Sequence, residues 1–486
     1  MNLRICAIMA LLAGATATCA VAIHAEEAEG RKEVPQTQEG AVGTENFSYI
    51  CKQKQDKEMQ KRSFVLKGNV AFSAADRTLV LHPNSYLVCE EGRCAGVFET
   101  LPERYSSLPL TDHGDRIIIP GMTDLHIHAP QFAFRGLGMD RELMEWLENY
   151  TYPEESHYAD LDYAERAYGL FASHMRRSAT TRACVFATVH RRATTLLMDK
   201  LEATGLITLV GKVNMDRLSP DFIRETTDGS IAETRLWIEE TAKKYERTKP
   251  IVTPRFIPTC TPELLTALGK MAADCGLPIQ SHLSENLGEI ALVREFEPET
   301  PTYGHAYDKY GLLGGTDNPC VMAHCVHSSD AELALLKERG VYIAHSPESN
   351  MNVSSGIAPI ARYLAMGLRV GLASDVAGGS SECMFAAMAH AIQASHLHWR
   401  LVDSTQPQLT FADAFFLATR SGGAFFGKVG AFEEGYDFDA LVIDDSDTET
   451  TRALSLAERL ERLPYHASWR NIVEKYVAGA ILENRE

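Results

Sequence analysis

The residues best suited to chemistry in this chain are histidines and acids that stand at the ends of short apolar segments. His126 and His128 close the apolar run Ile117–His128. In a strand, residues two apart point to the same side, so both imidazoles can face one metal ion. Imidazole nitrogen is a common ligand of Zn²⁺. The His-Ile-His motif therefore predicts a pair of metal ligands, and two packed core histidines are the alternative for so short a motif.

Three further groups follow in chain order. His282 ends another apolar segment, and Glu285 lies three residues later. A histidine ligand and a nearby acid that is not a ligand supply the two parts of hydrolytic deamination, an activated water and a proton carrier. Asp375 offers a carboxylate ligand, and His324 could orient the water or the substrate. Each group alone also fits a core histidine, a solvated acid or a helix cap, but the four together indicate one metal centre.

These groups stand at the ends of predicted strands that alternate with amphipathic helices. The eight strands that we predict are Ile117–His128, Ala183–His190, Ile207–Asp216, Ile251–Phe256, Pro278–His282, Val321–His324, Val341–His345 and Leu368–Asp375. Two helices have recognisable ends, from Thr261 to Gly276 and, with capping-box spacing, from Ser329 to Gly340. Phe411–Phe426 is predicted to form a later helix. The pattern predicts an α/β fold with a (β/α)₈ barrel of the TIM type, whose active site lies at the carboxyl ends of the strands.

The barrel is predicted to span residues 117–426 and to be a metal-dependent hydrolase domain, with the rest of the chain outside it. Residues 63–116 and 427–486 contain short, branched segments punctuated by Gly, Asn and Pro. We expect these N- and C-terminal segments to build one small β-sandwich domain. Residues 26–62 are polar and rich in Glu, Gln, Lys and Gly, so they are predicted to be a flexible lead-in.

Residues 1–25 have the pattern of a leader. Arg4 precedes an apolar run from Ile5 to Ala22, and the first acid is Glu26. The pattern resembles a secretory signal, because the run is only just long enough to span a bilayer. An N-terminal anchor, a dispensable extension or a wrongly assigned start codon are the alternatives. No other segment comes close to a membrane span, so no membrane partner is expected beyond this leader.

The composition of the chain limits the classes of partner that it is expected to bind. The chain has 486 residues, with 47 Lys and Arg against 65 Asp and Glu, which gives a net charge of −18. Such a surface repels phosphate backbones, so we expect no nucleic-acid partner. The 11 cysteines are scattered without a CxxC pair, which favours reduced, mostly buried thiols.

In its motifs the chain resembles the amidohydrolase superfamily in its mononuclear deaminase branch, and within it the guanine deaminases. The resemblance runs from about residue 63 to the C-terminus. The segments that carry it are Pro120-Gly121, His126–Gln131, Glu145–Leu147, Tyr150–Pro153, Gly211–Val213, Met215-Asp216, Thr253–Phe256, Gln280–Glu285 and Ser374–Gly379. Pro130, Ser346 and residues 380–383 depart from the family pattern, which affects the detail of the pocket.

The resemblance implies that guanine is hydrolysed to xanthine and ammonia with one Zn²⁺ per chain. It implies that the zinc ligands are His126, His128, His282 and Asp375. It implies that the purine is bound by Gln131, Arg255 and Phe256, and is also touched by His128, His282, Glu285 and Asp375. Glu285 would shuttle protons, while His324 and Asp375 would take the proton of the attacking water. The family also implies a homodimer in the cytoplasm, with the secretory pathway as the alternative location.

Four other functions remain open at this stage. A binuclear hydrolase would need a carbamylated lysine on the fourth strand, but Ile251–Phe256 has none and Lys212 falls on the third. A mononuclear amidohydrolase acting on another aminated heterocycle differs only in the pocket. A catalytically dead barrel used as a scaffold typically loses ligands, and this chain keeps all of them. A nucleic-acid-editing deaminase would carry a Cys-rich zinc motif, which is absent from the sequence.

Overall fold

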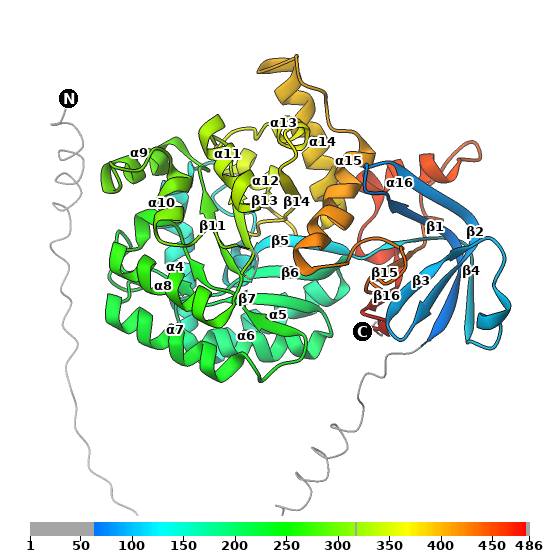
Figure 1. Ribbon diagram of the computed structural model, residues 1–486, viewed down its shortest axis with the longest axis horizontal. Helices are drawn as coiled ribbons and strands as arrows, with labels where there is room; N and C mark the ends of the chain where they lie inside the picture. The colour runs from blue at the N-terminus through cyan, green and yellow to red at the C-terminus, as the bar shows by residue number, and fades with distance from the viewer. Residues whose placement is uncertain (1–62, 316–317, 483–486) are drawn as a thin grey trace, which may run out of the picture. The chain divides into compact units, whose positions relative to one another are not determined.

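A computed structural model describes residues 63–315 and 318–482, and its ribbon is shown in Figure 1. The predicted leader (1–25) and lead-in (26–62) lie outside the described residues. Within the described part of the chain, no helix has both the length and the apolar character needed to cross a bilayer.

One mixed sheet of seven strands combines the two ends of the described chain. Its strands, in spatial order, are β17 (Ala480–Ile481), β16 (Ile472–Val477), β15 (Ala440–Ile443), β4 (Leu110–Pro120), β1 (Phe64–Ser73), β2 (Leu79–Glu90) and β3 (Arg93–Phe98). β15 pairs antiparallel with β4, with Val442 opposite Ile118. The N- and C-terminal segments thus share one sheet.

The two faces of this sheet are covered in different ways, which bears on the predicted β-sandwich. Ile117 and Ile119 point into the large core with Leu460 of α16 (Leu456–His466), whereas Ile118 packs with Phe432 and Phe438 on the other face. A helix and an irregular segment therefore cover the faces, and the described strands of these segments form a single sheet where a sandwich was expected. Alternating apolar residues predict strands with two faces, but they do not tell what covers each face.

The central part of the chain is mixed α/β, with parallel sheets. One sheet has the order β5 (Met122–His128), β6 (Thr180–Phe186), β7 (Ile207–Gly211), β9 (Thr248–Pro250), and a second has the order β11 (Ile279–Leu283), β12 (Cys320–His324), β13 (Tyr342–His345), β14 (Arg369–Leu372). A short pair joins β8 (Val213–Asn214) to β10 (Thr253–Pro254). All pairings in these sheets are parallel.

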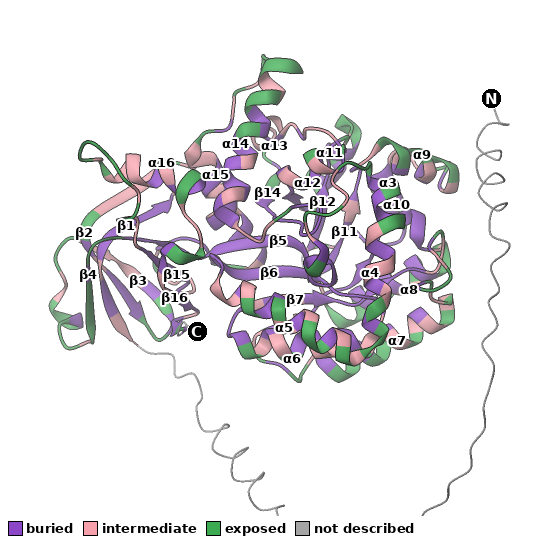
Figure 2. Cartoon of the chain, turned by 180° about the vertical axis from the view of Figure 1, so that it is seen from behind, coloured by how far each residue is buried: buried purple, intermediate pink, exposed green. Residues whose placement is uncertain are grey.

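Helices connect these strands and cover their outer sides, so that strands buried along their length lie inside (Figure 2). The helices from the first strand to the second are α3 (Leu143–Trp146), the π-helix η3 (Leu147–Thr151), α4 (Tyr152–Ser156) and α5 (Leu161–Arg177). The later ones are α6 (Arg191–Thr204), α7 (Thr227–Thr241), α8 (Pro262–Cys275), α9 (Leu287–Phe296), α10 (Tyr303–Lys309), α11 (Asp330–Arg339), α12 (Pro347–Asn352), α13 (Ile360–Ala365), α14 (Met384–Leu401) and α15 (Phe411–Phe416).

The helix ends that the sequence predicted are confirmed at the backbone. Thr261 accepts a hydrogen bond from the amide of Leu264, and α8 ends at the left-handed Gly276. Ser329 likewise accepts from the amide of Glu332 and α11 ends at Gly340. The Glu332 carboxylate does not return to the cap, however, because it accepts from Ser284 and from the amide of Gly304.

Several predicted elements have different bounds. The predicted strand Ile207–Asp216 is divided into β7 and β8, and the predicted strand Ile251–Phe256 contains only β10, since β9 ends before it at Pro250. The apolar run Ile117–His128 is two strands, because β4 ends at Pro120 in the seven-stranded sheet and β5 begins at Met122 in a parallel sheet. Gly121 joins them, and a Cβ there would lie 2.2 Å from Thr181, so the turn needs glycine. The helix predicted for residues 411–426 is α15 followed by a π-helix (Leu417–Ser421) and a 3₁₀ turn (Ala424–Phe426).

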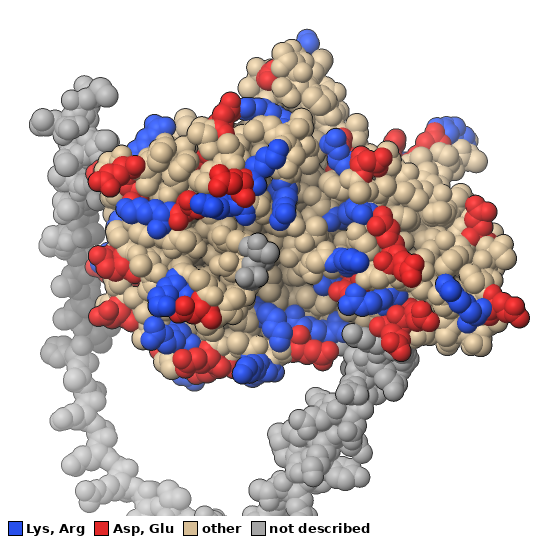
Figure 3. All heavy atoms as spheres, viewed as in Figure 1, with Lys and Arg blue, Asp and Glu red and all other residues tan. Residues whose placement is uncertain are grey.

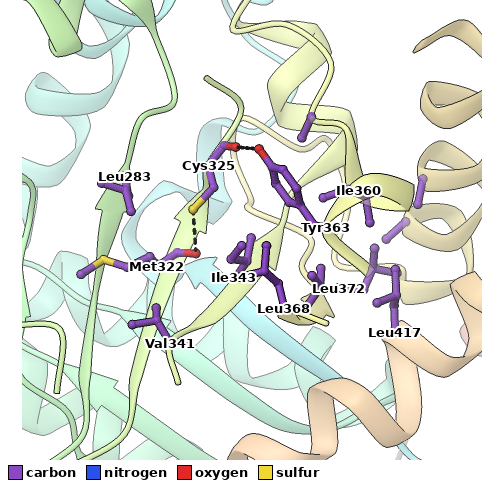
Figure 4. Close-up of a cluster of buried hydrophobic side chains, with 14 of the residues drawn as sticks. Leu283, Met322, Cys325, Val341, Ile343, Ile360, Tyr363, Leu368, Leu372 and Leu417 are labelled. Atoms are coloured by element: carbon purple, nitrogen blue, oxygen red, sulfur yellow. Dashed lines mark hydrogen bonds between the residues drawn. The ribbon is translucent and has the colours of Figure 1, made fainter. Parts of the chain in front are cut away.

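The largest apolar cluster of the described residues includes side chains of β12, β13 and β14 and of the helices that pack against these strands (Figure 4). Met322, Ile343 and Leu372 project from successive strands, and the Tyr363 hydroxyl donates to the carbonyl of Cys325. Several cysteines are buried free thiols, as the sequence predicted: Cys184, Cys260, Cys320 and Cys325. This packing holds the strand ends that carry the site.

Candidate active site

The four predicted zinc ligands converge at the carboxyl ends of the parallel strands. The Nε2 atoms of His126 and His128 lie 3.2 Å apart, and that of His282 lies 3.3 Å from His128 Nε2. A carboxylate oxygen of Asp375 lies 3.1 Å from His126 Nε2 and 3.5 Å from His128 Nε2. The same group can include His324, whose ring shares a potential metal site with His126 and Asp375.

The chemistry of these donors fits a divalent metal. Burial, and then the neighbouring histidines, hold the pKa values of His126, His128 and His282 well below the ordinary range, so the rings are neutral. The Nδ1–H of His282 donates to the carbonyl of Arg255 at 2.7 Å, which leaves the lone pair on Nε2. Neutral imidazoles facing a carboxylate are a donor set typical of zinc sites.

The backbone around these ligands is held in unusual conformations. β5 has a register irregularity between Asp124 and Ile127, and bulges of this kind re-aim side chains near active sites. Ser284, His324 and Asp375 have φ values of 47°, 74° and 48°, in the left-handed region that non-glycine residues rarely adopt. The surrounding contacts must stabilise these turns, which direct the chain sharply away from each strand end.

A buried acid links the first and last of these strand ends. Asp124 accepts from the amide of His126 at 3.2 Å, from the amide of Ser374 at 3.0 Å, and from the Ser374 hydroxyl. Burial raises its pKa to about 7. Because the bonds reach His126 itself and Ser374, the residue before Asp375, they fix the relative positions of two of the candidate ligands.

Glu285 lies beside this cluster with the features of a proton carrier. It is 3% exposed, one oxygen accepts from the Ser355 hydroxyl at 3.0 Å, and the other lies 3.4 Å from His324 Nε2. Burial, and then the charge of Asp375, raises the pKa of Glu285 to about 8, so its carboxyl is protonated at neutral pH. The Nδ1–H of His324 donates to Asn350 at 2.9 Å, which leaves its Nε2 facing both acids.

A pocket opens onto the cluster. Its polar lining includes Gln131, Arg255 and Glu285, together with three of the candidate ligands, His128, His282 and Asp375. Its apolar lining consists of Leu143, Trp146, Leu147, Phe256 and Val353. The Phe256 ring lies 6.5 Å from that of His282. An apolar wall with a few convergent polar groups suits a small planar heterocycle.

Two acids at the site were not among the predicted residues. Glu289 lines the pocket and accepts from the amides of Glu285 and Asn286, as the third residue of a capping box on α9. The Asn-x-x-Glu spacing of that box is a signal that could have found it. Glu155 bonds both Gln131 and Arg255 from outside the pocket lining, and no local pattern marks it.

Lys212, which the sequence placed on the third strand, lies outside the candidate metal groups of the described residues. Its ammonium is fully buried and bonds the Glu225 carboxylate at 2.6 Å. Because the Lys212 ammonium is held in this ion pair with Glu225, it offers no bridging ligand to the candidate metal site.

Charge on the visible surface is mixed. Figure 3 shows basic side chains interspersed with acidic ones on this face, with no continuous basic field. The arrangement agrees with the negative net charge.

Parallel sheets that present a His–Asp cluster at their carboxyl ends define a class of metal-dependent hydrolase. A model described as the amidohydrolase family matches residues 117–481, and the chain belongs to this family.

Guanine deaminases from other organisms are similar to the chain over most of its length. The chain is 35% identical over 443 residues to the guanine deaminase of Dictyostelium discoideum, covering 85% of this chain and 97% of that protein. It is 38% identical over 376 residues to the guanine deaminase of Homo sapiens, covering 74% of this chain and 82% of that one. A crystal structure of guanine deaminase from C. acetobutylicum with bound guanine in the active site has a TM-score of 0.84 and 43% identity, covering 87% of this chain and 100% of that one.

Proposed function

We propose that this protein hydrolyses guanine to xanthine and ammonia. The observation that carries the proposal is one pocket in which a His–Asp cluster, a protonated acid and the polar groups Gln131 and Arg255 lie together. Guanine deaminases resemble the chain over most of its length, and one such relative was crystallised with guanine in its active site.

We further propose that the cluster holds one Zn²⁺ per chain, with His126, His128, His282 and Asp375 as ligands. Two groups of three that share His126 lie close enough together to hold an ion: His126, His128 and His282, and His126, His324 and Asp375. An Asp375 oxygen also lies 3.5 Å from His128 Nε2, which links the two groups. When bound, zinc lowers the pKa of a water from ~15.7 to about 7 and so makes a nucleophile available at neutral pH.

The acids and histidines of the chain then move the protons. Asp375 and His324 accept the proton of the attacking water, an assignment supported by the 3.6 Å between an Asp375 oxygen and His324 Nε2. Glu285, protonated at neutral pH, donates to ring N3 of guanine as water adds to C2. Glu285 then takes up the proton that the water gave to Asp375 and His324 and passes it to the departing amine. The proton of the C2 hydroxyl returns to the Glu285 carboxylate as the C2 carbonyl forms. One guanine and one water thus give one xanthine and one ammonia.

Recognition of the base is assigned to Gln131, Arg255 and Phe256. Arg255 presents rigid N–H donors suited to the ring carbonyl oxygen O6. Gln131 can donate and accept along the same edge. Phe256 supplies an apolar ring at the pocket wall.

The parallel strands are proposed to close into the (β/α)₈ barrel of residues 117–426. Closure requires contacts between the edge strands of the two parallel sheets. An isolated parallel bridge supports one such contact, since it links Val252, just after β9, to Ile279 of β11. The second such contact lies between β14 and β5. There the amide of Asp375, which follows β14, donates to the carbonyl of His126 in β5 at 2.9 Å.

The test is purified full-length protein, assayed for bound metal and for ammonia release. We expect about one zinc per chain, and guanine turnover followed by loss of ultraviolet absorbance. A panel of amines, including cytosine, adenosine derivatives and triazines, should give much lower rates. No ammonia from guanine, or a faster rate with another ring, would refute the substrate assignment, and two metals per chain would favour a binuclear centre.

A further inference from the structure

A buried carboxylate connects the two polar residues proposed to hold the purine. Glu155, on α4, is fully buried. One of its oxygens accepts from Gln131 Nε2 at 2.9 Å, and the other accepts from Arg255 Nη1 at 2.7 Å. We propose that Glu155 is a positioning residue, which sets both side chains so that the pocket selects a neutral heterocycle bearing a ring carbonyl. The proposal rests on the proposed function for the identity of the base.

The first bond determines which way the Gln131 amide faces. Its NH₂ must point to Glu155, because a carboxylate only accepts, and its oxygen accepts from the amide of Ala377 at 3.2 Å. Flipping the amide would place oxygen against oxygen and NH₂ against N–H. One N–H and one lone pair of Gln131 therefore remain, in fixed directions, for a ligand that both accepts and donates.

The second bond neutralises the charge of Arg255. The guanidinium is 2% exposed and lies 5.1 Å from the Tyr152 ring. Burial alone lowers its pKa, but the nearby Glu155 and Tyr152 outweigh this, so the group stays charged. An unpaired cation here would attract an anionic ligand. With Glu155 as its partner, Arg255 can instead offer its remaining N–H donors to the carbonyl of a neutral base.

Glu155 acts through these residues, since it does not line the pocket whereas Gln131 and Arg255 both do. Its replacement should therefore weaken the recognition of a carbonyl without touching the rest of the site. In Glu155→Gln one acceptor oxygen becomes an NH₂, so one of the two bonds turns into a contact between N–H groups. Hydrogen bonds to charged groups contribute enough that a loss of tenfold or more is expected.

The experiment uses calorimetry to measure the binding of two probes to the protein. Because neither probe has to react, the result tests the proposal independently of turnover. Hypoxanthine keeps the ring carbonyl but lacks the amine, and purine lacks both. In E155Q we expect hypoxanthine to bind at least tenfold more weakly, purine to change less than threefold, and zinc content to stay unchanged. E154Q is the matched control, because Glu154 is the neighbouring acid on α4 and bonds Tyr163 instead. It should bind both probes as the parent does.

A second variant covers the case in which E155Q fails to fold with an unpaired buried arginine. The double variant Glu155→Gln with Arg255→Met removes both charges. Its ratio of purine to hypoxanthine dissociation constants should lie within threefold of the same ratio measured for Arg255→Met alone. Equal weakening of both probes, or a ratio in E155Q like that of the parent, would overturn the positioning role. If the parent releases no ammonia from guanine while the probe ratios behave as expected, the proposed function fails and the role of Glu155 stands.

Discussion

Replacing Glu285 by glutamine is the sharpest test of the proposed chemistry. The amide has nearly the same shape and can still accept from the Ser355 hydroxyl, now 3.0 Å from the carboxyl. Because burial keeps the parent carboxyl neutral, with a pKa of about 8, the variant buries no new charge and its stability should stay within about 1 kcal/mol of the parent. What it loses is a group that gives one proton to the ring and, once reprotonated, a second proton to the amine.

General acid–base catalysis contributes roughly 10²–10⁴ in rate. Glu285 is assigned two transfers in one cycle, so we expect kcat to fall by about 10³–10⁴, which corresponds to about 4–5.5 kcal/mol of transition-state stabilisation. KM for guanine should change little, since Gln131, Arg255 and Phe256 are untouched.

The assay pairs ammonia release with a zinc measurement on the same sample. We expect Glu285→Gln to keep about one zinc and to lose turnover. Glu263→Gln, a solvent-exposed acid at the first turn of α8, is the matched control and should behave as the parent. Near-normal ammonia release by Glu285→Gln would refute the assigned role, and loss of zinc would show that Glu285 supports the ligands instead.

Four more outcomes can be measured. Turnover should fall as pH rises past about 8, because Glu285 then loses its proton, and a flat pH–rate profile to pH 10 would contradict this. His282→Ala, like treatment with a chelator, should lose zinc and activity together, and full activity without metal would exclude the zinc mechanism. Arg182→Met should lower the free energy of unfolding by about 3–5 kcal/mol in urea titrations, since it leaves the buried Asp439 unpaired; a change below about 1 kcal/mol would contradict this. Gly121→Ala should lower thermal stability because its Cβ would overlap Thr181, and an unchanged melting temperature would show that the turn can adjust.

Local sequence patterns determined much of this protein. The two-residue spacing of His126 and His128, and the apolar segments that precede each candidate ligand, predict strands with chemical groups at their ends. The caps at Thr261 and Ser329 were equally readable. Such features depend on neighbours within a few residues, so the sequence carries them directly.

Tertiary structure decided the rest. Glu155 meets Gln131 and Arg255 across 24 and 100 positions of the chain, and a spacing of that kind has no periodicity to reveal it. The apolar run that holds both β4 and β5 is divided at Gly121 because β4 pairs with β15, a strand from the far end of the chain. These outcomes depend on which distant surfaces pack together, since burial and long-range hydrogen bonds are satisfied only once the whole chain has folded.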